Sequence, residues 1–155
     1  MIPLEWVNVV LAEKLQQGDF ALLLDQAQEP VLVGQLDQRV LAAFPSDMEG
    51  TAAYVDNLGG QALVIRDWEI EVDYTRSQRI EHLDVKVGSI LLSRGRLAIT
   101  CSRGRGHGLL ELPFRNCDFH GPEKIGFSAW RIIKMNGNEK VVLYERVPVK
   151  ATEKK

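Results

Sequence analysis

Short apolar runs separated by turn signals fill most of this chain, and they constrain its fold more than any other feature. The clearest pair lies near the C-terminal end, where residues 127–135 and 139–147 flank Asn136-Gly137-Asn138. Asparagine and glycine both tolerate a positive φ, which the tight turn of a hairpin requires. An Asn-Gly pair between two alternating runs therefore predicts a β-hairpin at this position.

Further runs of strand length precede this hairpin. They occupy residues 20–24, 31–36, 39–44, 62–74, 80–87, 88–93, 97–101 and 109–114. Turn signals recur about every 8–12 residues, a spacing typical of antiparallel sandwiches and barrels. At the N-terminal end, Trp6, Val9, Val10 and Leu11 form an apolar stripe that predicts a helix over residues 4–17.

We therefore expect a mainly β (α+β) fold: an antiparallel sandwich or open barrel of about 9–10 short strands with one N-terminal helix packed against it. The chain has 155 residues, of which 45% are hydrophobic, so residues 1–150 can form a single domain without disulfides. Residues 151–155 are expected to be a frayed, charged tail.

The sequence also indicates which classes of protein we do not expect. No apolar run approaches the ~18 residues of a membrane span, and the first residues lack the basic segment of a secretory signal. The chain has two cysteines, which suits a reducing compartment better than a disulfide scaffold. We expect a cytoplasmic protein with no membrane partner.

Charge is distributed very unevenly along the chain. Residues 1–75 carry thirteen acids and three bases, a net −10, whereas residues 76–155 carry eight acids and sixteen bases, a net +8. Such asymmetry points to polyelectrolytes or oppositely charged partners. The alternative is that the two halves fold together and neutralise each other.

The basic half contains an arginine- and glycine-rich segment over residues 93–108. Its arginines are Arg94, Arg96, Arg103 and Arg105, and glycines stand between them. Arginine offers a planar fork of donors that matches a phosphate, and glycine lets the backbone approach closely. The segment is predicted to be a loop that contacts a nucleic-acid backbone without reading its sequence. The alternative is a flexible hairpin loop whose arginines pair with acids of the other half of the chain or of a partner protein, or are simply solvated.

The acidic half contains a run in which Glu69, Glu71 and Asp73 alternate with apolar residues, so a strand would place all three on one side. This acidic face is a candidate protein-interaction site for a basic partner. The alternative is a solvated outer face of a sheet.

Four potential metal ligands, Cys101, His107, Cys117 and His120, lie within twenty residues. Two thiolates and two imidazoles would suit tetrahedral zinc, but their spacing matches no standard finger. We therefore predict no metal, with thiols and surface histidines as the simpler explanation. Cys117 and His120 do not make a triad, and no phosphate-binding glycine loop is present, so we also predict no catalytic residues and no cofactor.

Hydrophobic patterns spread over residues 20–147 resemble those of a known family. They are VLVGQL at 31–36, LGG at 58–60, ALVIRDW at 62–68, LPF at 112–114, WRII at 130–133 and LYERV at 143–147. In them the chain resembles the small accessory subunits associated with CRISPR type III-D effector genes. It departs from that pattern in the arginine- and glycine-rich segment, where fewer bases are expected.

This resemblance implies a non-catalytic subunit of an RNA-guided interference ribonucleoprotein. Its partners would be other subunits of the effector complex, with the guide or target RNA backbone as a further contact. The rival hypothesis is a stand-alone small β-barrel that binds a small molecule or acts as an enzyme. A deep apolar pocket with convergent polar groups would favour that rival.

Overall fold

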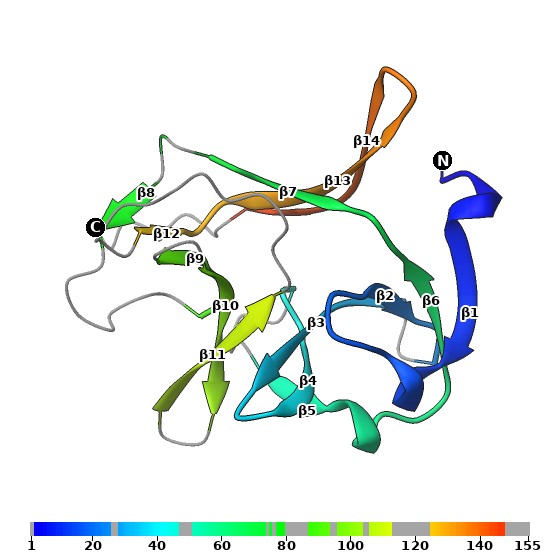
Figure 1. Ribbon diagram of the computed structural model, residues 1–155, viewed down its shortest axis with the longest axis horizontal. Coiled ribbons are helices and arrows are strands. Elements are labelled where there is room, and N and C mark those ends of the chain that lie inside the picture. The colour runs from blue at the N-terminus through cyan, green and yellow to red at the C-terminus, as the bar shows by residue number, and fades with distance from the viewer. Residues whose placement is uncertain are drawn as a thin grey trace, which may run out of the picture.

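The computed structural model describes residues 2–25, 28–46, 51–73, 75, 77–79, 87–93, 96–103, 106–112 and 125–147. These residues form fourteen strands and three short 3-10 turns (Figure 1). Every pairing between the named strands is antiparallel. The prediction of a mainly β, antiparallel fold is therefore confirmed.

The larger sheet, sheet A, contains eleven strands. They are β1 (Val7–Leu11), β2 (Phe20–Leu23), β3 (Glu29–Leu36), β4 (Arg39–Ala43), β5 (Ala52–Tyr54), β6 (Gln61–Ile65), β8 (Ser77–Arg79), β9 (Ile90–Ser93), β10 (Arg96–Arg103), β11 (Gly106–Leu112) and β12 (Ile125–Phe127). The strand order is β1-β6-β2-β3-β11-β10-β9-β12-β8, with β4 pairing β3 and β5 pairing β4.

The smaller sheet, sheet B, has the order β14-β13-β7, with β7 spanning Glu69–Val72, β13 Trp130–Asn136 and β14 Glu139–Arg146. The predicted Asn-Gly hairpin is confirmed: Gly137 has a φ of +61°, and the hairpin projects from the body (Figure 1). The remaining elements are the 3-10 turns η1 (Leu4–Trp6), η2 (Ala12–Lys14) and η3 (Val55–Asn57).

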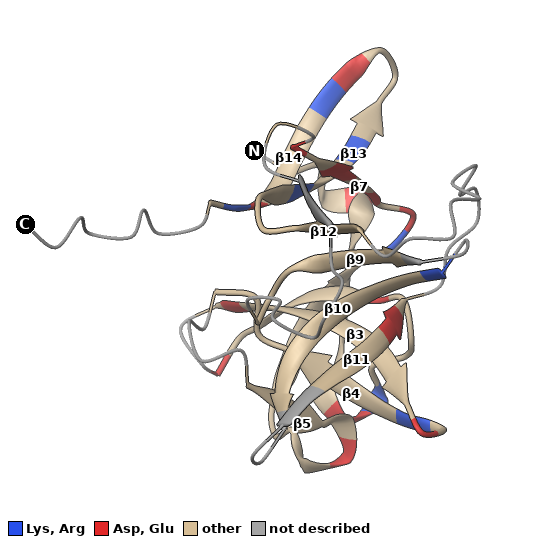
Figure 2. Cartoon of the chain, turned by 90° about the vertical axis from the view of Figure 1, so that its left-hand side faces the viewer, with Lys and Arg blue, Asp and Glu red and all other residues tan. Residues whose placement is uncertain are grey.

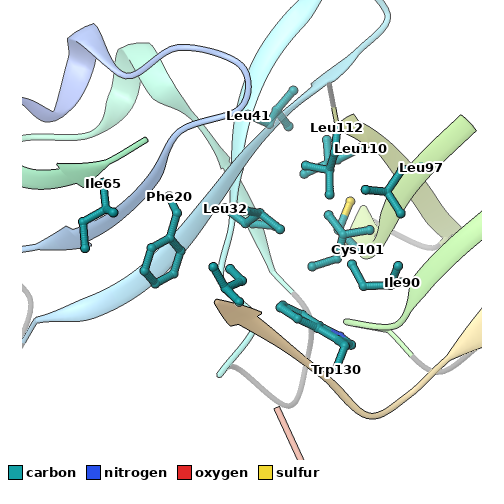
Figure 3. Close-up of a cluster of buried hydrophobic side chains, with 13 residues drawn as sticks. Phe20, Leu32, Leu41, Ile65, Ile90, Leu97, Cys101, Leu110, Leu112 and Trp130 are labelled. Carbon is teal, nitrogen blue, oxygen red and sulfur yellow. The ribbon is translucent and has the colours of Figure 1, made fainter. Parts of the chain in front are cut away.

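One hydrophobic core lies between the two sheets. Sheet B contributes Trp130 and Ile132, and sheet A contributes residues such as Phe20, Leu32 and Ile99, all of them at most 2% exposed. Figure 3 shows Trp130 approaching side chains that come from strands far apart in the sequence. Burial of this kind contributes about 25 cal/mol per Å² of apolar surface, so this core binds sheet B to sheet A.

A second core lies on the opposite face of β2, β3, β4 and β6, where η2 and η3 cover the sheet with Ala12, Leu15, Val55 and Leu58. Large parts of these four strands are consequently buried on both faces. Double burial explains why Val31, Leu32 and Val33 are a continuous apolar run instead of an alternating one.

The expected N-terminal helix over residues 4–17 is wrong. The segment forms η1, strand β1 and η2, and in the part of the chain that the structure describes no helix exceeds a three-residue 3-10 turn. The β-branched Val7, Val9 and Val10 favour an extended backbone. They pair with β6 from Val7↔Ile65 to Leu11↔Gln61. The described residues therefore form a mainly β fold without an α layer.

Other predictions are confirmed or fall outside the described residues. The strands predicted at 20–24, 31–36 and 39–44 are present as β2, β3 and β4, although β3 begins two residues earlier, at Glu29. Fourteen strands replace the 9–10 expected. Most of the strand predicted at 80–87, and the tail at 151–155, lie outside the described residues. No helix in the described part of the chain is long and apolar enough to cross a membrane.

Candidate binding surfaces

The sequence predicts one loop for the arginine- and glycine-rich segment, but the structure places a strand within it. Residues 96–103 form β10, which pairs with β9 on one side and with β11 on the other. Arg96 begins β10 and Arg103 ends it, so the two positions are roughly 23 Å apart at about 3.3 Å per residue. Arg94 and Arg105 lie outside the described residues, each within two positions of one end of the strand. The four arginines therefore belong to two separate ends of β10.

Arg96 stands out among the arginines whose side chains the structure describes. Its side chain is 79% exposed, and its Nη1 lies 3.4 Å from Oε1 of Glu111, which is itself 53% exposed. An exposed pair at this distance contributes at most about 1 kcal/mol. The guanidinium of Arg96 is therefore held only weakly by the protein.

The other four arginines with described side chains are held more firmly. Arg66 bonds the buried carboxylate of Asp19, and Arg39 lies over the ring of Tyr54. Arg131 contacts a carboxylate at 2.6 Å, and Arg146 donates to two backbone carbonyl oxygens. Among the arginines in ion pairs, the side chain of Arg96 is the most exposed, at 79% against 52% for Arg66 and 39% for Arg131.

The acidic strand is partly neutralised inside the molecule. Glu71 Oε1 accepts from Arg131 Nε at 2.6 Å, and its Oε2 accepts from Lys140 Nζ at 2.5 Å. Figure 2 shows acidic segments of β7 beside basic segments of the hairpin β13–β14. The hydrogen bond from Lys140, assisted by Arg131, lowers the pKa of Glu71 against the opposing effect of burial. At Glu71, the acidic and basic halves do neutralise each other.

The two neighbouring acids differ from Glu71. Glu69 is exposed on the same strand. Asp73 follows the strand, and its Oδ1 accepts from the backbone N–H and the hydroxyl of Thr75 at 3.0 and 2.6 Å. Glu69 therefore keeps the exposure that the proposed protein-interaction site requires, while Glu71 and Asp73 have local bonding partners.

The four potential metal ligands are not brought together within the described residues. Cys101 is buried in the core between the sheets, and its Sγ donates to the carbonyl oxygen of Gly108 at 3.6 Å. The side chain of His107, and the whole of Cys117 and His120, lie outside the described part of the chain. No group of three metal-ligating side chains occurs among the residues described.

Two open depressions mark the surface. One, of about 520 Å³, lies at the end of sheet B and is lined by charged groups that include Asp73, Arg131, Glu145 and Arg146. Burial lowers the pKa of Arg146 and raises that of the neighbouring Tyr144. The other, of about 550 Å³, lies beside Arg39 and Tyr54. Both differ from the enclosed, mostly apolar cavity typical of small-molecule sites.

Sequence reasoning missed the exposed surface at β1. Of the six large hydrophobic side chains that are exposed in the described residues, Leu4, Val9 and Leu11 lie on or beside this strand. The signal for an exposed strand was the uncharged, valine-rich run Val7–Leu11. The spacing of its apolar residues also fits a helix, so the sequence predicts a helix there.

Comparison with known proteins identifies a family. A family model with the description "Uncharacterised protein y4lG" matches residues 11–154. No curated protein and no solved structure matches the chain. The match begins at the last residue of β1 and runs through both sheets into the C-terminal tail. The chain therefore belongs to the y4lG family.

Proposed function

We propose that this protein is a non-catalytic accessory subunit of a ribonucleoprotein, which it joins by offering surfaces to larger molecules. The arginines at the ends of β10 contact the RNA backbone, and the exposed parts of the acidic half contact protein. The resemblance to type III-D accessory subunits supports a CRISPR type III effector complex as the assembly.

One observation carries the RNA contact: the side chain of Arg96 is 79% exposed, and its guanidinium has only a loose, exposed partner in Glu111. A guanidinium presents a planar set of donors that binds phosphate oxygens in pairs. Because the bond to Glu111 is weak, a phosphate can replace it at little cost. Arg94 adjoins the same end of β10, and Arg103 and Arg105 belong to the other end.

The separation of the two ends favours an extended ligand. A single phosphate cannot reach both ends of a strand that is roughly 23 Å long, whereas a nucleic-acid backbone carries a phosphate at every nucleotide. This arrangement supports binding of a strand of RNA over binding of a nucleotide. It supplies affinity without sequence preference.

Filter binding of a single-stranded RNA of mixed sequence, repeated over a range of salt concentrations, tests the RNA contact. The variant with Arg94, Arg96, Arg103 and Arg105 all changed to alanine should bind at least tenfold more weakly. The slope of log K against log[salt] is negative, and its magnitude should decrease by about 0.7 for every phosphate that the variant no longer neutralises. Arg39→Ala, which removes a cation from another part of sheet A, is the control and should bind like the wild type. Equal affinity and slope for the wild type and the fourfold variant would rule out this contact.

The identity of the assembly is tested separately. The type III proposal expects interference genes beside the gene for this chain. It also expects the purified chain to associate with the corresponding subunits when they are co-expressed. Lack of association with those subunits would rule out the CRISPR assignment, whatever the result of the RNA titration.

A further inference from the structure

Strand β1 lies at the margin of sheet A, and among the described strands it pairs with β6 alone. Figure 1 shows it on the outer side of the molecule, with its free edge turned away from the body. A free strand edge is a template for pairing with another chain, and proteins usually protect it with charges, proline or a bulge. None of these devices occurs in Val7–Leu11, whose sequence is Val-Asn-Val-Val-Leu.

The edges of sheet B are protected in the usual way. Strand β14 carries Glu139, Lys140, Glu145 and Arg146, and β7 carries Glu69 and Glu71. The contrast matters because all three strands are sheet margins. Among these three margins, it singles out β1 as the one that can accept another strand without burying a charge.

The pairing of β1 with β6 determines which of its backbone groups face outward. The N–H of Ala12 donates to the carbonyl oxygen of Gly60, which continues the register Val10↔Ala62 and Leu11↔Gln61. Hydrogen-bonded pairs alternate along an antiparallel ladder, so Asn8 and Val10 also bond to β6. The N–H and C=O groups of Val9, the C=O of Val7 and the N–H of Leu11 consequently point away from the sheet, toward an incoming strand. The N–H of Val7 donates to the carbonyl oxygen of Leu4 instead.

The side chains beside this edge form an apolar row. The registers Val9↔Leu63, Leu63↔Leu22 and Leu22↔Pro30 place four apolar residues side by side on one face of β1, β6, β2 and β3. Val9 is 58% exposed, Leu11 is 49% exposed, and the other three are partly exposed. An added strand would extend this row and cover Val9 and Leu11.

We propose that β1 binds an extended segment of a partner protein as an additional antiparallel strand. The segment has alternate apolar residues, which continue the row of Val9 and Leu63, and basic residues at both ends. This inference rests on the proposed role as an accessory subunit and specifies how the protein partner is held. It is the β-augmentation mode of recognition, in which main-chain bonds give affinity and alternate side chains give specificity.

Charge at the two ends of β1 selects a basic partner. The exposed Glu5 and Glu13 flank the strand, and Asp25 and Asp67 are exposed nearby. The neighbouring bases are Lys14, Arg66 and Lys134. Arg66 is bonded to Asp19, and Lys134 lies over the ring of Trp6 and donates to the carbonyl oxygen of Arg66. A segment with a lysine or arginine at each end would therefore meet an excess of negative charge.

The same charges disfavour a second copy of this chain. Antiparallel self-pairing that uses the outward groups places Val9 opposite Val9 of the other copy. That register sets Glu5 of each copy beside Glu13 of the other, at both ends of the interface. Like charges directly opposite each other are destabilising, so a basic segment fits this edge better than another β1.

The test uses two labelled peptides, Lys-Val-Thr-Val-Thr-Val-Lys and its glutamate-ended counterpart, titrated against the full chain by fluorescence anisotropy. The lysine-ended peptide should bind at least tenfold more tightly. Val9→Pro removes one outward N–H without removing a bond to β6, and proline is tolerated at such an edge position. It should weaken binding at least tenfold. Val9→Thr keeps the N–H and the branched side chain, so it should bind within about threefold of the wild type.

Each other outcome overturns the inference. Equal binding by Val9→Pro and Val9→Thr would show that β1 is not the docking edge, as would a failure of the wild type to bind the lysine-ended peptide. A wild-type dimer in sedimentation that Val9→Pro converts to a monomer would identify a second copy as the occupant. Val9→Pro should retain the RNA affinity of the wild type, so peptide binding and RNA binding can fail independently.

Discussion

The indole Nε1 of Trp130 donates a hydrogen bond of 2.9 Å to the carbonyl oxygen of Gly88, and this bond fastens sheet B to the turn that precedes β9. Arg146 reinforces the junction, with Nη2 donating to the oxygen of Val87 at 2.9 Å and Nη1 to that of Ser128 at 2.6 Å. Gly88 itself donates to the oxygen of Thr100 at 2.7 Å. One turn thus connects both sheets through three hydrogen bonds.

Gly88→Ala should destabilise the protein by about 2–4 kcal/mol. Gly88 has a φ of +84°, which costs an L-residue roughly 1–2 kcal/mol. In addition, a Cβ here would lie 2.9 Å from the guanidinium of Arg146, which could move away only by straining its hydrogen bonds to Ser128 and Val87. Gly137→Ala is the matched control, because its φ of +61° is also positive but no atom lies within 4 Å of the added Cβ. Urea denaturation of both variants separates the steric cost from the backbone cost. Equal destabilisation of the two would show that the clash with Arg146 contributes nothing.

Gly34→Ala should also destabilise, by about 1–3 kcal/mol, for a different reason. A Cβ at Gly34 of β3 would lie 2.8 Å from Cβ of Leu110 and 2.9 Å from the backbone oxygen of Glu111, both in β11. The described register between β3 and β11 is the single pair Glu111↔Gln35, so the added atom would push apart the strands that join the two halves of sheet A.

Gly59→Ala provides the control for Gly34→Ala. Nothing lies within 4 Å of its added Cβ, and its φ is not positive, so the change should fall within about 0.5 kcal/mol of the wild type. Calorimetry of the two variants compares them directly. A Gly34→Ala variant as stable as Gly59→Ala would show that β3 and β11 can separate without destabilising the fold.

Glu71→Gln should lower stability by about 0.5–1 kcal/mol at neutral pH and progressively less in acid. Lys140 and Arg131 lower the pKa of Glu71 in the folded protein. The folded state therefore binds fewer protons than the unfolded state in mildly acidic solution. The stabilisation is complete above the ordinary glutamate pKa, near 4.5, and is lost as the pH falls through the lowered value.

Urea unfolding of the wild type and Glu71→Gln at pH 7 and at pH 3 measures this difference. Glu69→Gln is the matched control, since it removes a carboxylate from the same strand without breaking the bonds to Arg131 and Lys140. A constant difference between the wild type and Glu71→Gln over the whole pH range would contradict this account.

Local signals in the sequence predict individual hairpins but not the way that they join. Asn136-Gly137 located the C-terminal hairpin because a tight turn needs only its own residues. Glu29 and Pro30 are residue types that often break a strand, yet both lie in β3, opposite Leu23 and Leu22. The position of β1 beside β6 depends on the pairing of Val7 with Ile65, which is fifty-eight positions away, and no local pattern encodes it. A helical spacing of apolar residues consequently outweighed the β-branched composition of Val7–Leu11.

The candidate surfaces follow the same division. The arginines of residues 94–105 were visible as a composition, but the strand that separates Arg96 from Arg103 divides them into two ends. Glu69 and Glu71 lie in one strand, as the alternation predicts, and Asp73 follows it. The bonds from Arg131 and Lys140 to Glu71 depend on the neighbouring strand and its hairpin partner, which the local sequence does not show. The exposure of Val9 follows from the position of β1 at the margin of sheet A, which the local sequence does not show.

The pair Arg96 and Glu111 offers a test with opposite signs for the RNA contact. Arg96→Ala should weaken RNA binding several-fold and reduce the salt slope by about 0.7, because one phosphate is no longer neutralised. Glu111→Gln should instead strengthen binding, because it removes the carboxylate that lies 3.4 Å from the guanidinium and repels phosphate.

In Arg96→Ala, the further change Glu111→Gln should give a smaller gain, since one of its effects on the wild type acts through Arg96. Filter binding of the two single variants and the double variant measures this coupling. Strictly additive changes would mean that Arg96 does not exchange Glu111 for a phosphate.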